Sequence, residues 1–480
     1  MNATIRRSAL IMGVLILALI INVNVLAVIQ DDDLRARDGN SRQIIEEYDH
    51  QRGSILVGRK AIAESESTRD RLKYLRTYSD GPLFSPVTGY YSLYGATGIE
   101  KSANDLLAGT DDRLFVDRLT NLFTGQQPKG ANVVLTLDPD AQRAAYDKLA
   151  GQAGAVVALN PRTGEVLAMA STPSFDPNLL ASHDPNEVTD NYDRLRKDPD
   201  DPLLNRATQQ IYPPGSLFKV VVAAAALESG KYQPDTVIPA PASLDLPDTS
   251  ASINNYDNLP CLGGSVTLQE ALAISCNTAF ARIGMDLGDD ALRKQAEAFG
   301  FNESLEIPLP VVPSVYPEDL DAPQTALSAI GQFNVRATAT QMAMVGAGVA
   351  NDGVLMAPYL VAEERAPDLA SLSTTEPEVL SRPLSSSAAD QLAEMMVSVV
   401  TSGTGTEAQI DGFTVAGKTG TAQDGSVRPP HVWFLAFAPA EDPQVAVAVI
   451  VENGGVLGEE ATGGAVAAPI AKAVMEAVLQ

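Results

Sequence analysis

A long apolar segment near the N-terminus constrains this chain more than any other sequence feature. Residues Ala9 to Ile29 form a run of 21 residues that is apolar except for one glycine and two asparagines. A helix of that length spans the hydrocarbon core of a bilayer. Arg6 and Arg7 precede the run and three aspartates follow it, which favours a cytoplasmic N-terminus. The sequence therefore predicts a membrane anchor within residues 1–30 and an exported body.

A cleaved signal peptide is the alternative interpretation of this segment. Val25-Leu26-Ala27 has the small-residue character of a cleavage site after a shorter apolar region. The apolar run continues past that site through Ile29, which favours an uncleaved anchor. Both interpretations export the rest of the chain.

Charge and residue counts exclude several function classes. The chain has 34 basic and 60 acidic residues, a formal net charge of -26, and no run rich in lysine or arginine. This balance repels phosphate backbones, so nucleic acid is not an expected partner. The three histidines do not stand at metal-ligand spacing with either cysteine. We expect neither a metal nor another cofactor.

The strand pattern predicts one sheet interrupted by a helical insertion. A chain of 480 residues is long enough for two or three domains. We divide the exported body into a smaller domain over residues 31–150 and a larger domain over residues 151–480. In the larger domain, two strand-like runs flank a turn near its start. Three more lie near its end, before a closing helix from about Ala465 to Leu479. The expected strands are Ala155 to Leu159, Glu165 to Ser171, Phe413 to Ala416, Val432 to Ala438 and Val445 to Glu452.

The first segment with catalytic character is Gly215-Ser216-Leu217-Phe218-Lys219, which leads into an apolar run. The run predicts a short buried helix, with Ser216 in its first turn and Lys219 on the same face. Burial and the helix dipole disfavour an ammonium there, so the pKa of Lys219 should fall and the amine can act as a base. A serine at a helix start is more often a cap. This motif alone is therefore weak evidence for a catalytic serine.

Two further motifs follow along the chain. Ser275-Cys276-Asn277 comes after a helix that opens with a capping box, and offers a hydroxyl for proton relay and an amide for a peptide group. Residues of this kind are also common at helix ends. Gly417-Lys418-Thr419-Gly420-Thr421-Ala422 continues a strand, whose edge can dock an extended peptide while Lys418 attracts a carboxylate.

The third motif also matches a phosphate-binding loop. Residues Gly412 to Thr419 fit the pattern Gly-x-x-x-x-Gly-Lys-Thr. Such a loop must open a helix, whereas glycines and prolines fill the stretch from Gly420 to Pro430. We therefore expect no nucleotide site.

The three motifs together carry a family resemblance. Their order, Ser-x-x-Lys, Ser-x-Asn and Lys-Thr-Gly, is typical of penicillin-binding proteins and serine β-lactamases. The chain resembles the class B penicillin-binding proteins, and most closely the penicillin-binding protein A type of actinobacteria. The resemblance extends to Arg52-Gly53-Ser54-Ile55, Gly98-Ile99-Glu100-Lys101, the stretch Thr163 to Met169, Ile330-Gly331-Gln332 and Trp433-Phe434.

The resemblance implies a fold and a set of roles. The fold would be an α/β (α+β) transpeptidase fold, a five-stranded antiparallel sheet flanked by helices, with a non-catalytic pedestal or dimer-type domain before it. The chain would be a peptidoglycan D,D-transpeptidase. Ser216 would attack D-alanyl-D-alanine, Lys219 would be the base, and Ser275 would relay protons with Lys418. The sequence leaves open which of the two lysines removes the Ser216 proton. Substrate would be held by Asn277, Thr419, Gly420 and Thr421, with the backbone amides of Ser216 and Thr421 as the oxyanion hole.

The resemblance also implies partners, and it leaves other activities open. The partners would be stem peptides ending in D-Ala-D-Ala, β-lactams, the cytoplasmic membrane, and proteins of cell-wall synthesis or division. The alternatives are a D,D-carboxypeptidase or β-lactamase of the same fold, and a non-catalytic divisome scaffold. Intact Ser216, Lys219 and Lys418 count against a scaffold.

Cys261 and Cys276 are the only two cysteines in the chain. An even pair in an exported protein favours a disulfide, which would tie the second motif to the loop before its own helix. Two buried reduced thiols are the alternative.

Overall fold

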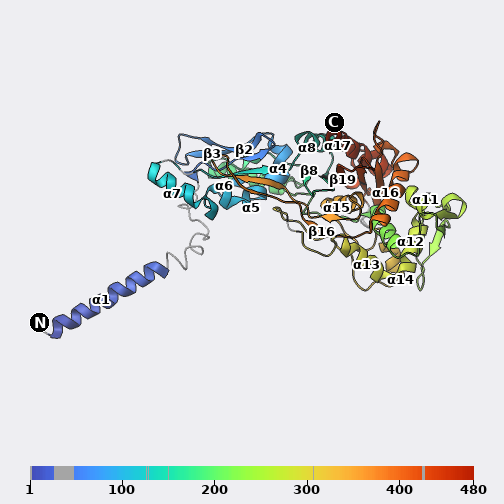
Figure 1. Ribbon diagram of the computed structural model, residues 1–480, viewed down its shortest axis with the longest axis horizontal. Helices are drawn as coiled ribbons and strands as arrows, with labels where there is room; N and C mark the ends of the chain where they lie inside the picture. Colours follow the sequence, from blue (N-terminus) through green and yellow to red (C-terminus); the bar gives the residue numbers. More distant parts are fainter. Residues whose placement is uncertain are drawn as a thin grey trace.

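The computed structural model describes residues 3–25, 48–125, 127, 129–149, 151–305, 307–423 and 428–480. Figure 1 shows an elongated body, with the N-terminal elements in blue at one end and the helical insertion in green and yellow at the other. The C-terminal strands and helices, in red, lie against the insertion. The aspartates after the anchor and most of the alternative cleavage site fall outside the described residues.

The N-terminal helix α1 (Ala3–Asn24) covers the predicted anchor as far as Asn24. Its segment Ile5–Asn24 has a mean hydropathy of 1.9 and is long and apolar enough to cross a membrane. None of this segment is buried against the rest of the described chain. The predicted anchor extended to Ile29, and its last four positions lie outside the described residues.

The five-stranded antiparallel sheet is confirmed, with two early strands joined to three late ones in the order β17-β18-β19-β7-β8. The strands are β17 (Ala416–Ala422), β18 (His431–Ala438), β19 (Val445–Val451), β7 (Gly154–Leu159) and β8 (Val166–Thr172). One expected strand was placed too early, because Phe413, Thr414 and Val415 precede β17 and only Ala416 belongs to it. The glycines and polar residues of β17 lack an apolar strand pattern, but the prediction that the Lys-Thr-Gly motif continues the strand is confirmed.

Helices cover both faces of this sheet, which explains why β18 and β19 are buried along their whole length. One set of alternate side chains, including Trp433 and Leu435, packs into the core formed with α10 and α15. The other set, including Phe434, packs with α8 and α17. The covering helices are α8 (Pro139–Leu149), α10 (Lys219–Glu228), α15 (Ala339–Ala350), α16 (Ser386–Thr401) and α17 (Ala468–Leu479).

The insertion between β8 and β17 carries most of the remaining helices and several short strand pairs. Its other helices are α9 (Pro185–Lys197), α11 (Leu268–Ala273), α12 (Asn277–Leu287), α13 (Asp289–Ala298) and α14 (Ala322–Ser328). Its short strands are β9 (Val237–Pro239), β10 (Ser243–Asp245), β11 (Ser252–Asn254), β12 (Ser265–Thr267), β13 (Leu355–Met356) and β16 (Val379–Ser381).

A second sheet of six strands, in the order β15-β14-β6-β1-β2-β3, forms the smaller part of the body. Its strands are β1 (Ile55–Val57), β2 (Lys60–Ser67), β3 (Tyr74–Tyr78), β6 (Asn132–Leu135), β14 (Val361–Arg365) and β15 (Ser371–Thr374). Around it lie α4 (Gly81–Thr88), β4 (Tyr91–Ser92), β5 (Gly95–Ala96), α5 (Gly98–Ser102), α6 (Asn104–Ala108) and α7 (Phe115–Thr124).

The two sheets do not divide the chain at a single point. Strands β14 and β15 return from the larger part to complete the smaller sheet, while α8 packs on the five-stranded sheet. The domain boundary at residue 150 stays a prediction. In the structure, a late segment completes the smaller sheet and an early helix packs on the larger one.

A buried ion network holds the smaller part together. The Glu100 carboxylate, with no exposed area, accepts from Arg52 Nε at 2.7 Å and from Arg76 Nε at 2.5 Å. Burial alone would raise the pKa of Glu100, but the two guanidinium groups outweigh it and the pKa falls below its ordinary value. The sequence stretches Arg52 to Ile55 and Gly98 to Lys101 are therefore joined by a buried ion pair.

Replacing Glu100 with alanine should destabilise the protein strongly, because two buried guanidinium groups would lose their counter-charge. Removing one partner of a buried pair costs about 3–5 kcal/mol. Urea unfolding of Glu100→Ala beside Glu66→Ala, which removes an exposed carboxylate, would measure the difference. Equal stabilities for the two variants would contradict the assigned role of Glu100.

Candidate active site

The segment that carries Ser216 folds as one helical turn followed by a buried helix. Residues Gly215–Phe218 form a 3-10 turn, η4, and α10 begins directly at Lys219. Lys219 has no exposed surface, whereas Ser216 is partly exposed. No hydrogen bond within the described part of the chain engages the Ser216 hydroxyl, so this oxygen is free to meet a substrate.

Close backbone contacts fix the position of η4. The Gly215 amide donates to the Gly331 carbonyl at 3.0 Å, and the Trp433 indole Nε1 donates to the Pro213 carbonyl at 3.1 Å. A Cβ added to Gly331, which has φ of +70°, would lie 2.0 Å from the Gly215 oxygen. Only glycine fits there, which gives a physical reason for Ile330-Gly331-Gln332 in the sequence.

The η4 turn also packs against the edge strand β17. A Cβ on Gly420 would lie 2.6 Å from Leu217 Cδ1, and one on Gly215 would lie 2.7 Å from the Thr421 carbonyl oxygen. The backbone segments of Ser216 and Thr421, whose amides are the predicted oxyanion hole, are therefore in contact. Among the strands of the described residues, none pairs with the outer side of β17, which leaves an edge for an extended peptide.

The three motifs meet around the hydroxyl of Ser275. Lys219 Nζ donates to the Ser275 carbonyl at 2.7 Å and lies 3.2 Å from its Oγ. Lys418 Nζ donates to the same Oγ at 2.9 Å and to the Thr419 carbonyl at 2.9 Å. One hydroxyl therefore lies between two lysine nitrogens, as a proton relay requires.

Asn277 has a structural task at this site in addition to its predicted one. Its Oδ1 accepts from Lys219 Nζ at 2.7 Å, and its Nδ2 donates to the Asn254 carbonyl at 2.9 Å. The amide therefore orients Lys219. One N–H of the exposed Nδ2 remains for a substrate carbonyl.

The second motif is held in an unusual backbone conformation. Ser275 has φ of 61°, a region that non-glycine residues rarely adopt. Cys276, which precedes α12, is bonded to Cys261 with the two Cα atoms 6.2 Å apart. The predicted disulfide therefore joins the strained motif to the loop before α11.

Burial lowers the pKa of both lysines. Loss of solvation holds the pKa of Lys219 well below its usual range, and the nearby charge of Lys418 lowers it further. Loss of solvation also lowers the pKa of Lys418 to about 7. Burial therefore favours the neutral amine of Lys219, in the direction that the sequence predicted.

Comparisons with known proteins agree with this geometry. Residues 154–476 match the family described as penicillin binding protein transpeptidase domain, and residues 52–133 match the penicillin binding protein A dimerisation domain. The peptidoglycan D,D-transpeptidase PbpA of Mycolicibacterium smegmatis is 46% identical over 493 residues, which cover 100% of this chain and 99% of that protein.

Solved structures give the same result. The ceftriaxone acyl-enzyme complex of penicillin-binding protein A from M. tuberculosis aligns with a TM-score of 0.88 at 43% identity, over 91% of this chain and 100% of that one. The penicillin G acyl-enzyme complex of that protein aligns at 0.86 and 44% identity, over 90% and 100%. The chain belongs to the penicillin-binding protein transpeptidases. The resemblance predicted from the three motifs is confirmed.

The position of Lys418 in a strand argues against a nucleotide-binding loop. Lys418 lies inside β17, paired with Leu435 of β18. A phosphate-binding loop would place this lysine at the start of a helix. The match to the phosphate-loop pattern is therefore a coincidence of sequence.

Sequence reasoning missed several residues that make contacts around this candidate site. Thr404 shares a hydrogen bond of 2.6 Å with Thr419, and Glu452 accepts from the Tyr212 hydroxyl at 2.7 Å and from Arg206 Nε at 2.9 Å. These contacts join segments far apart in the chain, so spacing could not reveal them. Gly331 and Trp433 were noticed in the sequence, but without a role.

The lowered pKa of Lys418 should make folding stability depend on pH. Between about pH 7 and the ordinary lysine pKa of 10.5, the unfolded chain binds more protons at this residue, so raising the pH stabilises the folded state. Compared with the near-isosteric Lys418→Met, wild type should gain stability with pH by at most about 1.4 kcal/mol per pH unit. Chemical unfolding at several pH values measures this. A stability difference that stays constant with pH would contradict the lowered pKa.

Proposed function

We propose that this chain is a peptidoglycan D,D-transpeptidase in which Ser216 is the nucleophile and neutral Lys219 is its base. The observation that carries the proposal is the buried Lys219 nitrogen, held by Ser275 and Asn277 one helical turn from the partly exposed Ser216. A serine is a weak nucleophile until an adjacent base takes its proton. In this chain a lysine supplies that base without a histidine.

The first half-reaction forms an acyl-enzyme. Ser216 Oγ attacks the carbonyl between the two D-alanines of a stem peptide, while Lys219 Nζ takes the hydroxyl proton. The backbone amides of Ser216 and Thr421 stabilise the oxyanion. Ser275, hydrogen-bonded to Lys418, passes a proton to the leaving amine. The D-Ala-D-Ala amide bond breaks, an ester to Ser216 forms, and D-alanine leaves.

The second half-reaction transfers the peptide. An amine of a neighbouring stem attacks the ester and gives a proton to the lysine pair. The ester C–O bond breaks as the new amide bond forms, and the lysine pair returns the proton to Ser216 Oγ. The outer edge of β17 accommodates an extended peptide by strand addition. On that edge, Thr419, Gly420 and Thr421 hold the substrate, and Asn277 binds a peptide carbonyl from the opposite side.

The N-terminal helix supports a location at the membrane. With α1 as an anchor, and with Arg6 and Arg7 at its start before the apolar run, the catalytic body lies on the outer side of the cytoplasmic membrane. Contacts with proteins of cell-wall synthesis or division stay a prediction. The smaller part of the body, which matches a dimerisation domain, is where we expect them.

Benzylpenicillin should acylate Ser216 and remain attached, because a β-lactam imitates the D-Ala-D-Ala terminus and water attacks the ester slowly. Intact mass and peptide mapping should show one adduct on the peptide containing Ser216. Acylation of Ser216→Ala at the wild-type rate would show that another residue is the nucleophile. Rapid release of hydrolysed drug would instead indicate a β-lactamase.

Replacing Lys219 with alanine should slow this acylation by at least about a hundredfold, the usual effect of losing a general base. Lys231→Ala, which removes a surface lysine paired with Asp286, is the matched control and should acylate normally. Thermal melting checks that both variants are folded. A folded Lys219→Ala protein that acylates within a few fold of wild type would exclude Lys219 as the base.

A further inference from the structure

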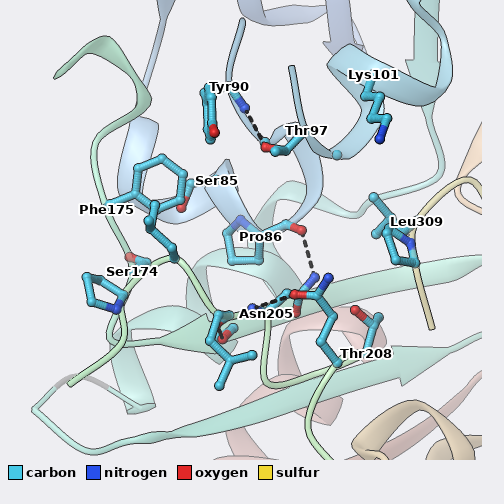
Figure 2. A pocket seen from close by; sticks show the side chains of 18 of the residues that line it. Ser85, Pro86, Tyr90, Thr97, Lys101, Ser174, Phe175, Asn205, Thr208 and Leu309 are labelled. Carbon is cyan, nitrogen blue, oxygen red and sulfur yellow. Dashed lines mark hydrogen bonds between the residues drawn. The ribbon is translucent and has the colours of Figure 1, made fainter. Parts of the chain in front are cut away.

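A cavity of about 650 Å³ lies between the smaller part of the body and the catalytic part. In Figure 2, Tyr90, Thr97 and Lys101 lie along one side of it and Asn205 and Thr208 along the other, with Pro86 between them. None of the three catalytic motifs lines this cavity. The site is therefore separate from the one that carries Ser216.

The walls combine aromatic rings with neutral polar groups. Tyr90 and Phe175 meet edge to face, with ring centroids 6.1 Å apart, and Tyr192 on α9 lines the same space. Of the lining residues that the structure describes, Lys101 alone is charged. Aromatic rings bind the apolar faces of a ligand, and hydroxyl and amide groups bind its polar edges. A polyanion or a highly charged peptide fits this lining poorly.

Two buried hydroxyls in the wall lack partners. Ser85 Oγ and Thr208 Oγ1 make no hydrogen bond within the described part of the structure, and both residues line the cavity. A buried hydroxyl without a partner is unfavourable, and native proteins contain few of them. A ligand in the cavity that hydrogen-bonds to these oxygens would supply the missing partners.

We propose that this cavity binds a saccharide of the peptidoglycan glycan, an N-acetylated amino sugar or a pair of them. A sugar ring has apolar C–H faces for Tyr90, Phe175 and Tyr192, and hydroxyl and acetamido groups for Ser85 and Thr208. The volume is in the range of cavities that hold small ligands. The assignment rests on the proposed function, since stem peptides are carried on such glycans.

The cavity is connected to the nucleophile segment through the chain itself. The stretch from Pro202 to Gln209 forms one wall and leads to the η4 turn a few residues later. Within and just after this stretch, Arg206 and Tyr212 both donate to the Glu452 carboxylate. A sugar bound here would hold a glycan strand at a fixed distance from Ser216.

Titration calorimetry of the full-length protein with the tetrasaccharide of β-1,4-linked N-acetylglucosamine tests the proposal. Binding should persist after benzylpenicillin has acylated Ser216, fall at least about tenfold in Tyr192→Ala, and stay unchanged in Tyr256→Ala. Tyr256 is 83% exposed and lies outside the cavity. Absent binding, equal binding by Tyr192→Ala, or loss of binding on acylation would overturn the assignment. If a stem peptide without sugar bound this cavity more tightly than the tetrasaccharide, the ligand would be a peptide and not a saccharide. None of these results affects acylation of Ser216, which tests the proposed function separately.

A second variant tests the unpartnered hydroxyl. Thr208→Val keeps the shape and removes the oxygen, so the sugar-free protein should melt at a higher temperature while saccharide affinity falls. Wild-type affinity in Thr208→Val would show that the hydroxyl does not contact the sugar and would contradict the proposed contact.

Discussion

Two buried lysine nitrogens on either side of one serine hydroxyl are the interaction on which this molecule depends. An ammonium in a protein interior is unfavourable unless acceptors surround it. Here the acceptors are the carbonyl and hydroxyl of Ser275, the amide oxygen of Asn277 and the carbonyl of Thr419. The remaining unfavourable energy appears as lowered lysine pKa values, which is the property that a base for Ser216 requires.

The surrounding fold keeps these groups at their distances. Lys219 comes from the helix behind Ser216, Lys418 from the edge strand, and Ser275 from a strained junction tied down by a disulfide. Gly331 and Gly420 allow neighbouring segments to approach closely, because a Cβ at either position would clash. The Trp433 indole adds a hydrogen bond to the segment before Ser216. The sheet and its two helical layers serve mainly to fix this arrangement.

The sequence predicted the parts of this structure that have a local signature. The apolar strands β7, β18 and β19, the buried helix after Ser216 and the cysteine pair were all visible as patterns. Strand β17 was placed too early, because a strand that lines a site carries glycine, lysine and threonine instead of apolar residues. The return of β14 and β15 to the smaller sheet, and the bond from Asn277 to Lys219, depend on contacts between distant segments that spacing does not encode.

The pH dependence of Ser216 acylation tests the central claim most directly. If burial makes Lys219 a neutral base, the rate with benzylpenicillin should reach its plateau well below the ordinary lysine pKa of 10.5. Rates measured from about pH 5 to about pH 10 would show this plateau. A rate that keeps rising about tenfold per pH unit toward pH 10 would mean that the lysine pair keeps ordinary pKa values, and would contradict the account.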